Sequence, residues 1–161
     1  MSGTKITTLP CLKRKVRIFK REGKRIVFTN GCFDILHYGH IKYLEDAKNK
    51  GDYLIVAVNS DSSIKKIKAP GRPVIGQSDR LKTVAALASV DFVLLFNEDN
   101  PLKLIKALKP DILIKGSDWN KNKIVGADFV KSYGGKVMTV NLVKNRSTSA
   151  IINKIVRDFP K

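Results

Sequence analysis

The sequence predicts a single α/β domain in which a five-stranded parallel sheet lies between layers of helices. Short apolar runs alternate with segments of helical period, and this alternation implies parallel βαβ units with right-handed crossovers. The length of 161 residues is sufficient for one domain with a proper core. No linker, repeat or low-complexity segment divides the chain. We therefore expect one doubly wound domain.

Five short runs are the expected strands, and the second of them, Tyr53–Asn59, is apolar throughout, as expected where helices cover both faces of a sheet. They lie at Ile26–Thr29, Tyr53–Asn59, Asp91–Phe96, Asp111–Lys115 and Lys136–Val140. The expected helices between and after them lie at His37–Lys50, Asp79–Ser89, Pro101–Leu108, Val125–Tyr133 and Ala150–Arg157. Gly51 stops the first, Ser78 caps the second and Pro101 opens the third. Residues 61–77 are expected to be irregular.

Residues 1–24 are expected to form a basic N-terminal extension ahead of the main domain, which spans residues 25–161. A helix over Cys11–Arg21 places Leu12, Val16 and Phe19 along one apolar edge. An apolar edge on a basic helix suggests a surface for self-association. We therefore expect a homodimer.

Composition excludes several classes of protein. With 43% hydrophobic and 28% charged residues, the chain is globular rather than disordered. Its longest apolar runs are too short to cross a bilayer, and its N-terminus lacks the apolar region of a signal peptide. Two cysteines, Cys11 and Cys32, make no disulfide framework and fit a reducing compartment. We expect a cytoplasmic protein without a membrane partner.

The formal charge of +17 allows two interpretations. It indicates either an anionic partner, such as nucleic acid, an acidic membrane or phosphorylated small molecules, or a lysine-rich solvated surface. Residues 1–30 carry nine basic residues and one acid, Glu22. The solvated interpretation is favoured for this segment. No RNA-binding signature accompanies it, so no nucleic-acid partner is expected.

The stretch RIVFTNGCFDILHYGH, residues 25–40, carries the strongest functional signal. It reads as a strand, a glycine-bearing turn and a helix start that holds His37 and His40, the only 2 histidines of the chain. Residues three apart on a helix share a face, so both imidazoles can point at one spot. Free backbone N–H groups and the helix dipole favour an anion there, and Gly39 leaves room for a close approach. The pattern predicts a phosphate site with two imidazoles.

Other interpretations of this stretch remain open. The histidines can be structural, and Cys32, Asp34, His37 and His40 are all potential metal ligands. Cys32 can also be a nucleophile, although a small half-buried thiol is the commoner case. Metal binding does not explain the glycine turn at a helix start. We favour the phosphate site and assign no metal ligands.

Further unusual loops follow the other strands. In open parallel sheets, ligands bind beyond the carboxyl ends of the strands, at a switch point. Lys65, Lys66 and Lys68 follow the second strand, where they could close over a triphosphate or simply be solvated. The loop GSDWNKNK follows the fourth strand. Arg146 precedes three hydroxyls at a second helix start, which predicts a second anion site; the hydroxyls are those of Ser147, Thr148 and Ser149.

These residues resemble a known family. HYGH at 37–40 matches the HxGH motif of the nucleotidylyltransferase superfamily, and 147–149 is similar to its second motif, ST[ST]. One branch is closer still, the adenylyltransferase domain of D-glycero-β-D-manno-heptose 1-phosphate biosynthesis. The segments that resemble it are NGCFDILHYGH, NSDSSIKKIKAPGRP, ALASVDFV, KPDILIKGSDW, IVGADFVKSYGG and LVKNRSTSAII. The resemblance spans about Arg25 to Val156 and implies a Rossmann-like nucleotidylyltransferase domain over 25–161.

The resemblance implies that ATP and heptose 1-phosphate react, with Mg²⁺, to give ADP-heptose and pyrophosphate for the lipopolysaccharide inner core. It implies transition-state stabilisation by His37 and His40 and neutralisation of the triphosphate by Lys68. The nucleotide-binding residues that it implies are Thr29, Asn30, Gly31, Cys32, Phe33, Gly39, Lys65, Arg146, Ser147, Thr148 and Ser149. Asp34 and Asp118 are the implied substrate-binding residues.

Other functions are kept as alternatives. The related glycerol-phosphate cytidylyltransferases carry RTxGxST where this chain has KNRST, and some carry an arginine where it has Ala88. These departures weaken the alternative that the chain is a cytidylyltransferase acting on a small polyol or amino-alcohol phosphate, but this alternative is kept. A basic nucleic-acid-binding protein and a non-catalytic nucleotide sensor are the remaining alternatives.

Overall fold

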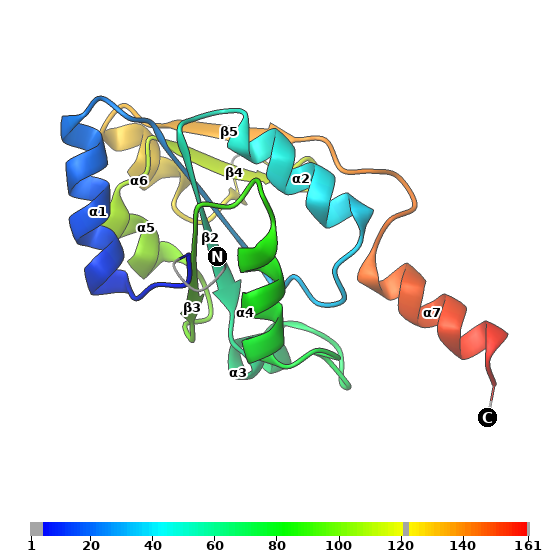
Figure 1. Ribbon diagram of the computed structural model, residues 1–161. Helices are drawn as coiled ribbons and strands as arrows, with labels where there is room; N and C mark the ends of the chain where they lie inside the picture. Colours follow the sequence, from blue (N-terminus) through cyan, green and yellow to red (C-terminus); the bar gives the residue numbers. More distant parts are fainter. Residues whose placement is uncertain (1–4, 121–122, 161) are drawn as a thin grey trace.

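The sheet has the predicted class and a switch point near its centre. The computed structural model describes residues 5–120 and 123–160, and its parallel sheet has the order β3-β2-β1-β4-β5 (Figure 1). Its strands are β1 (Ile26–Gly31), β2 (Tyr53–Asn59), β3 (Phe92–Phe96), β4 (Ile112–Gly116) and β5 (Lys136–Val140). The chain builds β1, β2 and β3 outward in one direction and then crosses to β4 on the other side of β1. The chain thus reverses direction between the neighbouring strands β1 and β4, and ligands of such sheets bind beyond the carboxyl ends of the strands at this switch point.

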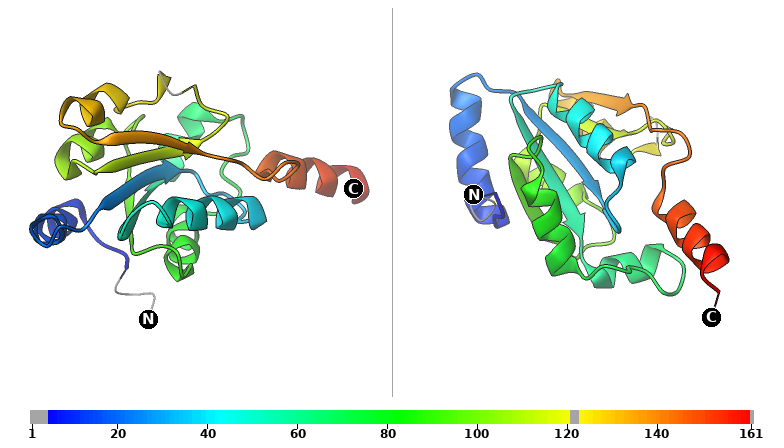
Figure 2. Two further views of the ribbon diagram at one scale, coloured as in Figure 1. Left: turned by 90° about the horizontal axis from the view of Figure 1, so that it is seen from above. Right: turned by 45° about the vertical axis from the view of Figure 1, so that its right-hand side comes forward.

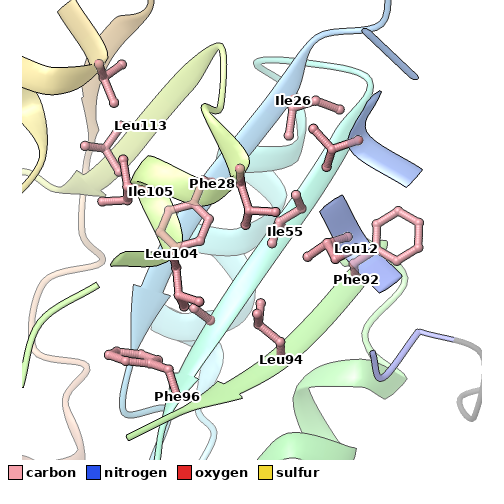
Figure 3. Close-up of a cluster of buried hydrophobic side chains, with 14 of the residues drawn as sticks. Leu12, Ile26, Phe28, Ile55, Phe92, Leu94, Phe96, Leu104, Ile105 and Leu113 are labelled. Atoms are coloured by element: carbon pink, nitrogen blue, oxygen red, sulfur yellow. The ribbon is translucent and has the colours of Figure 1, made fainter. Parts of the chain in front are cut away.

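Helices cover both faces of the sheet (Figure 2). One core cluster joins strand residues such as Phe28 and Ile55 to α1 (Leu9–Arg21), α5 (Leu102–Leu108) and α6 (Ala127–Ser132) (Figure 3). The opposite cluster joins Val27 and Val56 to α2 (Tyr38–Lys48) and α4 (Gln77–Ala86). Adjacent strand residues point to opposite faces, so the continuous apolar runs supply both clusters. No described helix is long and apolar enough to span a membrane.

The N-terminal helix α1 packs against the sheet of its own chain. Leu12 and Val16 are buried, and the ring of Phe19 stacks on Tyr53 with 3.9 Å between centroids. The predicted helix and its apolar edge are confirmed. That edge is buried within the chain, however, so it does not supply the dimer surface that it suggested. The homodimer and a domain boundary after residue 24 stay predictions.

The expectation of an irregular segment at 61–77 was wrong in its first half. Residues Asp61–Ile67 form α3, because the Ser60 hydroxyl caps its start by accepting a hydrogen bond from the Ser63 N–H at 3.2 Å. The next helix, α4, begins with Gly76 at its N-cap, so Ser78 does not cap it. The Gln77 N–H donates to Asp61 at 3.2 Å, which ties the two helix starts together.

The last helix, α7 (Thr148–Asp158), extends away from the layered body (Figures 1 and 2). Its first residue, Thr148, is nonetheless buried, and the side chain of Ser147 caps the helix by accepting from the Ala150 N–H at 3.1 Å. The start of α7 is therefore fixed against the body of the domain, beside the start of α2.

Candidate active site

A cavity of about 580 Å³ lies at the carboxyl end of the sheet and collects most of the predicted residues. Its walls come from the loops after β1, β2 and β4 and from the start of α7. The predicted residues that line it are Asn30, Gly31, Cys32, Phe33, Asp34, His37, Gly39, His40, Lys68, Asp118, Arg146, Ser147, Thr148 and Ser149. Stretches that are distant in the sequence thus meet at the β1–β4 switch point.

Two predicted nucleotide contacts lie outside this cavity. The Thr29 side chain is fully buried, with its hydroxyl 2.6 Å from that of Tyr43 and donating to the Ile114 carbonyl at 3.0 Å. It therefore supports the floor of the site from within the core. Lys65 is exposed on α3 and does not line the cavity. Lys68, just after α3, does line it.

The two histidines stack at the N-terminus of α2. Their ring centroids lie 3.9 Å apart with an interplanar angle of 24°, and Phe33 meets the His40 ring edge-on at 5.4 Å. His37 is the N-cap residue, and His40 lies in the first turn. Both Nδ1 atoms are buried, without a hydrogen-bond partner in the described part of the chain. The stacked pair is thus held by packing, and neither Nδ1 atom forms a hydrogen bond with a described residue.

Both imidazoles are neutral near pH 7. Burial, followed by the nearby Arg146 charge, lowers the pKa of His37. Burial and the neighbouring His37 lower the pKa of His40 from 6.5 to about 4. A neutral imidazole carries one N–H donor and one acceptor nitrogen. The pair can therefore donate hydrogen bonds to an anion at neutral pH without carrying a charge.

This depressed pKa predicts a stability that depends on pH. Between pH 6.5 and about 4, an unfolded chain protonates His40 while the folded chain does not. The free energy of unfolding should therefore fall as the pH drops through this window. We expect the wild type to lose about 2–3 kcal/mol more than His40→Asn between about pH 7.5 and about pH 4.5. Urea unfolding at both pH values measures this, and equal losses in the two proteins would show that His40 is not desolvated.

Gly39 makes room for neighbouring side chains and also lines the cavity, so the expected close approach of a ligand to its backbone stays a prediction. A Cβ there would lie 2.9 Å from Cε1 of His37 and 3.2 Å from Cβ of Arg146. The helix starts of α2 and α7 therefore approach each other across this glycine. The absence of a side chain is what allows His37 and Arg146 to share one wall of the cavity.

Asp34 positions a loop and does not present a free carboxylate to a substrate. Its buried oxygens accept from Arg72 Nε at 2.6 Å and from the N–H groups of Val74 and Ile75, each at 2.9 Å. Burial by itself raises the pKa of Asp34, but these backbone donors and Arg72 hold it below its usual value. The flanking residues Phe33 and Ile35 both have a φ of 49°, so a strained turn is fixed here.

The three hydroxyls at the start of α7 have different surroundings. Ser147 caps the helix, and the Thr148 hydroxyl donates to the Asp34 carbonyl at 2.5 Å. Capping and anchoring therefore account for two of the hydroxyls that the sequence assigned to phosphate. Ser149 and Arg146 are exposed and line the cavity. These two are the groups of this segment best placed for an anion.

Two residues with important contacts were missed in the sequence. Arg80 on α4 is fully buried and donates to the Ile75 carbonyl at 2.9 Å, the Cys32 carbonyl at 2.5 Å and Asp61 at 2.7 Å. It joins the turn after β1 to the segment that carries Lys68. The sequence did carry a signal for the burial of Arg80, because it lies four residues before Val84 and therefore on the same face of the helix.

Lys115 is the second missed residue. It lies at the end of β4, is 8% exposed and lines the cavity. Its Nζ donates to the carbonyl and to the side-chain oxygen of Asn30, at 3.1 and 2.5 Å. Burial lowers its pKa to about 8. In the sequence, the lysine at the end of the apolar run ILIK could have indicated a functional residue.

The alternatives to a phosphate site find little support in these contacts. The Asp34 carboxylate is occupied by Arg72 and two N–H groups, so it is not available to bind a metal with the histidines. Among residues 5–120 and 123–160, no group of three or more His, Cys, Asp or Glu is placed to hold a metal ion. Burial raises the pKa of Cys32, which keeps the thiol protonated and poorly nucleophilic.

Comparison with known proteins agrees with this geometry. The family model described as cytidylyltransferase-like matches residues 28–156. The bifunctional protein HldE of Methylobacillus flagellatus is 50% identical over 151 residues, which are 94% of this chain and 31% of that protein. HldE of Campylobacter fetus subsp. fetus is 56% identical over 135 residues, 84% of this chain and 29% of that protein. The chain thus spans about a third of the length of these relatives.

Two solved structures resemble the chain. The lipopolysaccharide core biosynthesis protein from Thermoplasma volcanium has a TM-score of 0.61 and 34% identity, over 76% of this chain and 98% of that one. Pantothenate synthetase from Thermus thermophilus has a TM-score of 0.58 and 15% identity, over 86% of this chain and 62% of that one. The second similarity concerns the fold alone.

Proposed function

The chain belongs to the cytidylyltransferase-like family, and from that premise we propose that it transfers AMP from ATP to heptose 1-phosphate. The observation that carries the proposal is the stacked pair His37 and His40 at the start of α2, inside a cavity at the sheet switch point. The similarity to HldE proteins and to a lipopolysaccharide core biosynthesis protein supports the sugar phosphate as acceptor. The products are ADP-heptose and pyrophosphate.

The proposed reaction needs no covalent enzyme intermediate. An oxygen of the acceptor phosphate, already ionised, attacks the α-phosphorus of ATP in line. A new oxygen–phosphorus bond forms there, the bond to the bridging oxygen breaks, and pyrophosphate leaves with its electron pair. Because the nucleophile is ionised, no general base is required. Catalysis is then positioning and charge stabilisation.

The residues of the cavity divide this work among them. His37 and His40 donate hydrogen bonds to oxygens on which charge develops, and the N-terminus of α2 adds its backbone N–H groups. Lys68 and Arg146, which both line the cavity, bring cations to the triphosphate. Asp118 and Trp119, which follow β4 and line the cavity, face the nucleotide or the sugar. Asn30, Gly31, Cys32 and Phe33 form the wall against which the phosphates lie.

Mg²⁺ is part of the proposal as an ion that enters with the nucleotide. Mg²⁺ is usually bound by one or two carboxylates together with substrate phosphates. Asp118 is a carboxylate on the cavity wall, whereas Asp34 is occupied, so the donor set fits an ion carried mainly by phosphate. When bound, the ion would neutralise charge on the phosphate oxygens. We place the reaction in the cytoplasm, which fits the free cysteines Cys11 and Cys32.

Pyrophosphate release with ATP and CTP side by side, and heptose 1-phosphate as acceptor, tests the proposal. We expect release with ATP and little with CTP. Release with CTP and a small polyol or amino-alcohol phosphate would instead support the cytidylyltransferase alternative. ATP binding without release would indicate a nucleotide sensor. Binding of DNA that weakens steeply with salt, with no release, would indicate a nucleic-acid-binding protein.

A further inference from the structure

Lys115 is a buried cation without an acidic partner. It is 8% exposed, and it forms no salt bridge within the described part of the chain. The two hydrogen bonds that it donates to described residues both go to Asn30. Buried charges in proteins are ordinarily paired, because removing an ammonium from water is costly. Among residues 5–120 and 123–160, no carboxylate therefore pairs with the charge of Lys115, whose Nζ lies over the ring of Trp119.

The place of Lys115 shows what could compensate this charge. It is the penultimate residue of β4, which pairs with β1 at the switch point of the sheet, and it lines the same cavity as the two histidines. An ammonium has three N–H donors, and two acceptors on Asn30 leave one of them for the cavity. Cys32 and Asp118, the titratable groups that raise its pKa electrostatically, make no ion pair with it. An anion in the cavity would supply the missing partner.

We propose that Lys115 binds a phosphate oxygen of one of the two reactants, the nucleotide or the sugar phosphate. The identity of these reactants rests on the function proposed above. The alternative is a purely structural lysine that tethers the Asn30 loop to β4. The two roles differ in what they require: the tether needs only hydrogen-bond donors, whereas phosphate binding also needs the positive charge.

Lys115→Gln separates these roles, because an amide keeps N–H donors but has no charge. Lys82→Gln is the matched control, since Lys82 is exposed on α4 and its substitution changes the net charge equally. The sequence contains a single tryptophan, Trp119, and Lys115 Nζ lies 5.4 Å from the centre of its ring. Its fluorescence can therefore report binding next to Lys115, and calorimetry gives the same affinities independently.

The experiment titrates both variants and the wild type with ATP, heptose 1-phosphate and inorganic pyrophosphate, each alone. We expect Lys115→Gln to bind at least one of them about tenfold or more weakly, and Lys82→Gln to bind as the wild type does. Loss for ATP and pyrophosphate assigns the contact to the nucleotide, and loss for the sugar phosphate alone assigns it to the acceptor. Unchanged affinities in Lys115→Gln, equal losses in Lys82→Gln, or no anion binding by the wild type would overturn the proposal.

These titrations involve no turnover, so they are independent of the reaction proposed above. A wild type that binds ATP through Lys115 but releases no pyrophosphate would contradict the proposed function and leave this inference intact. If the wild type releases pyrophosphate and Lys115→Gln binds with unchanged affinity, the proposed function stands and the inference about Lys115 is contradicted. Thermal unfolding of each variant, with and without ATP, shows whether an affinity loss merely follows from a damaged fold.

Discussion

His37→Ala and His40→Ala are each expected to lose about 10²–10³ in kcat while remaining folded. In the proposed mechanism, each substitution removes one hydrogen-bond donor aimed at the reacting phosphates. The rings are neutral near pH 7, so the loss is one of oriented hydrogen bonds and not of charge. The fold should survive, because the buried Nδ1 atoms have no hydrogen-bond partner in the described part of the chain that the substitution would leave unsatisfied.

Steady-state pyrophosphate release with saturating ATP and acceptor measures this loss. Tyr38→Ala is the matched control, because Tyr38 lies between the two histidines and its side chain is 56% exposed. We expect nearly full turnover from the control and an unchanged circular dichroism spectrum from all three variants. A histidine variant that keeps more than about a tenth of the wild-type kcat would be incompatible with the assigned role.

Much of this site could be predicted because its strongest signals are local. A strand, a glycine turn and two histidines at one helix start are contiguous in the sequence, and their mutual geometry follows from helical spacing. The strand limits at Tyr53–Asn59 and Lys136–Val140 agree with the structure because turn residues bound both apolar runs.

What could not be predicted depends on tertiary contacts. The Asp34 carboxylate is occupied by hydrogen bonds from Arg72 and from two backbone N–H groups about forty residues away. The burial of Lys115 beside Asn30, without a carboxylate partner among the described residues, depends on the pairing of β4 with β1. Ser60 as a helix cap was a local signal, but the lysine-rich sequence after it obscured a short helix. The misassigned residues are therefore mainly those that join separate segments.

Arg80→Met is expected to lower the free energy of unfolding by about 3 kcal/mol or more. The guanidinium is fully buried and donates to two carbonyls and to Asp61. Methionine fills a similar volume but leaves the Cys32 and Ile75 carbonyls without this donor. Asp61 is less affected, because 35% of its side chain is exposed and water can replace the lost partner.

Urea unfolding at neutral pH measures the loss, with Lys82→Met on the exposed side of α4 as the control for removal of one positive charge. A second measurement separates stability from positioning. At a temperature where Arg80→Met remains folded, kcat/KM should still fall, because Arg80 holds the turn after β1 against the segment that leads to Lys68. A variant with wild-type stability would mean that Arg80 is dispensable to the packing of this region. A destabilised variant with full activity while folded would mean that the cavity keeps its shape without the link between the two segments.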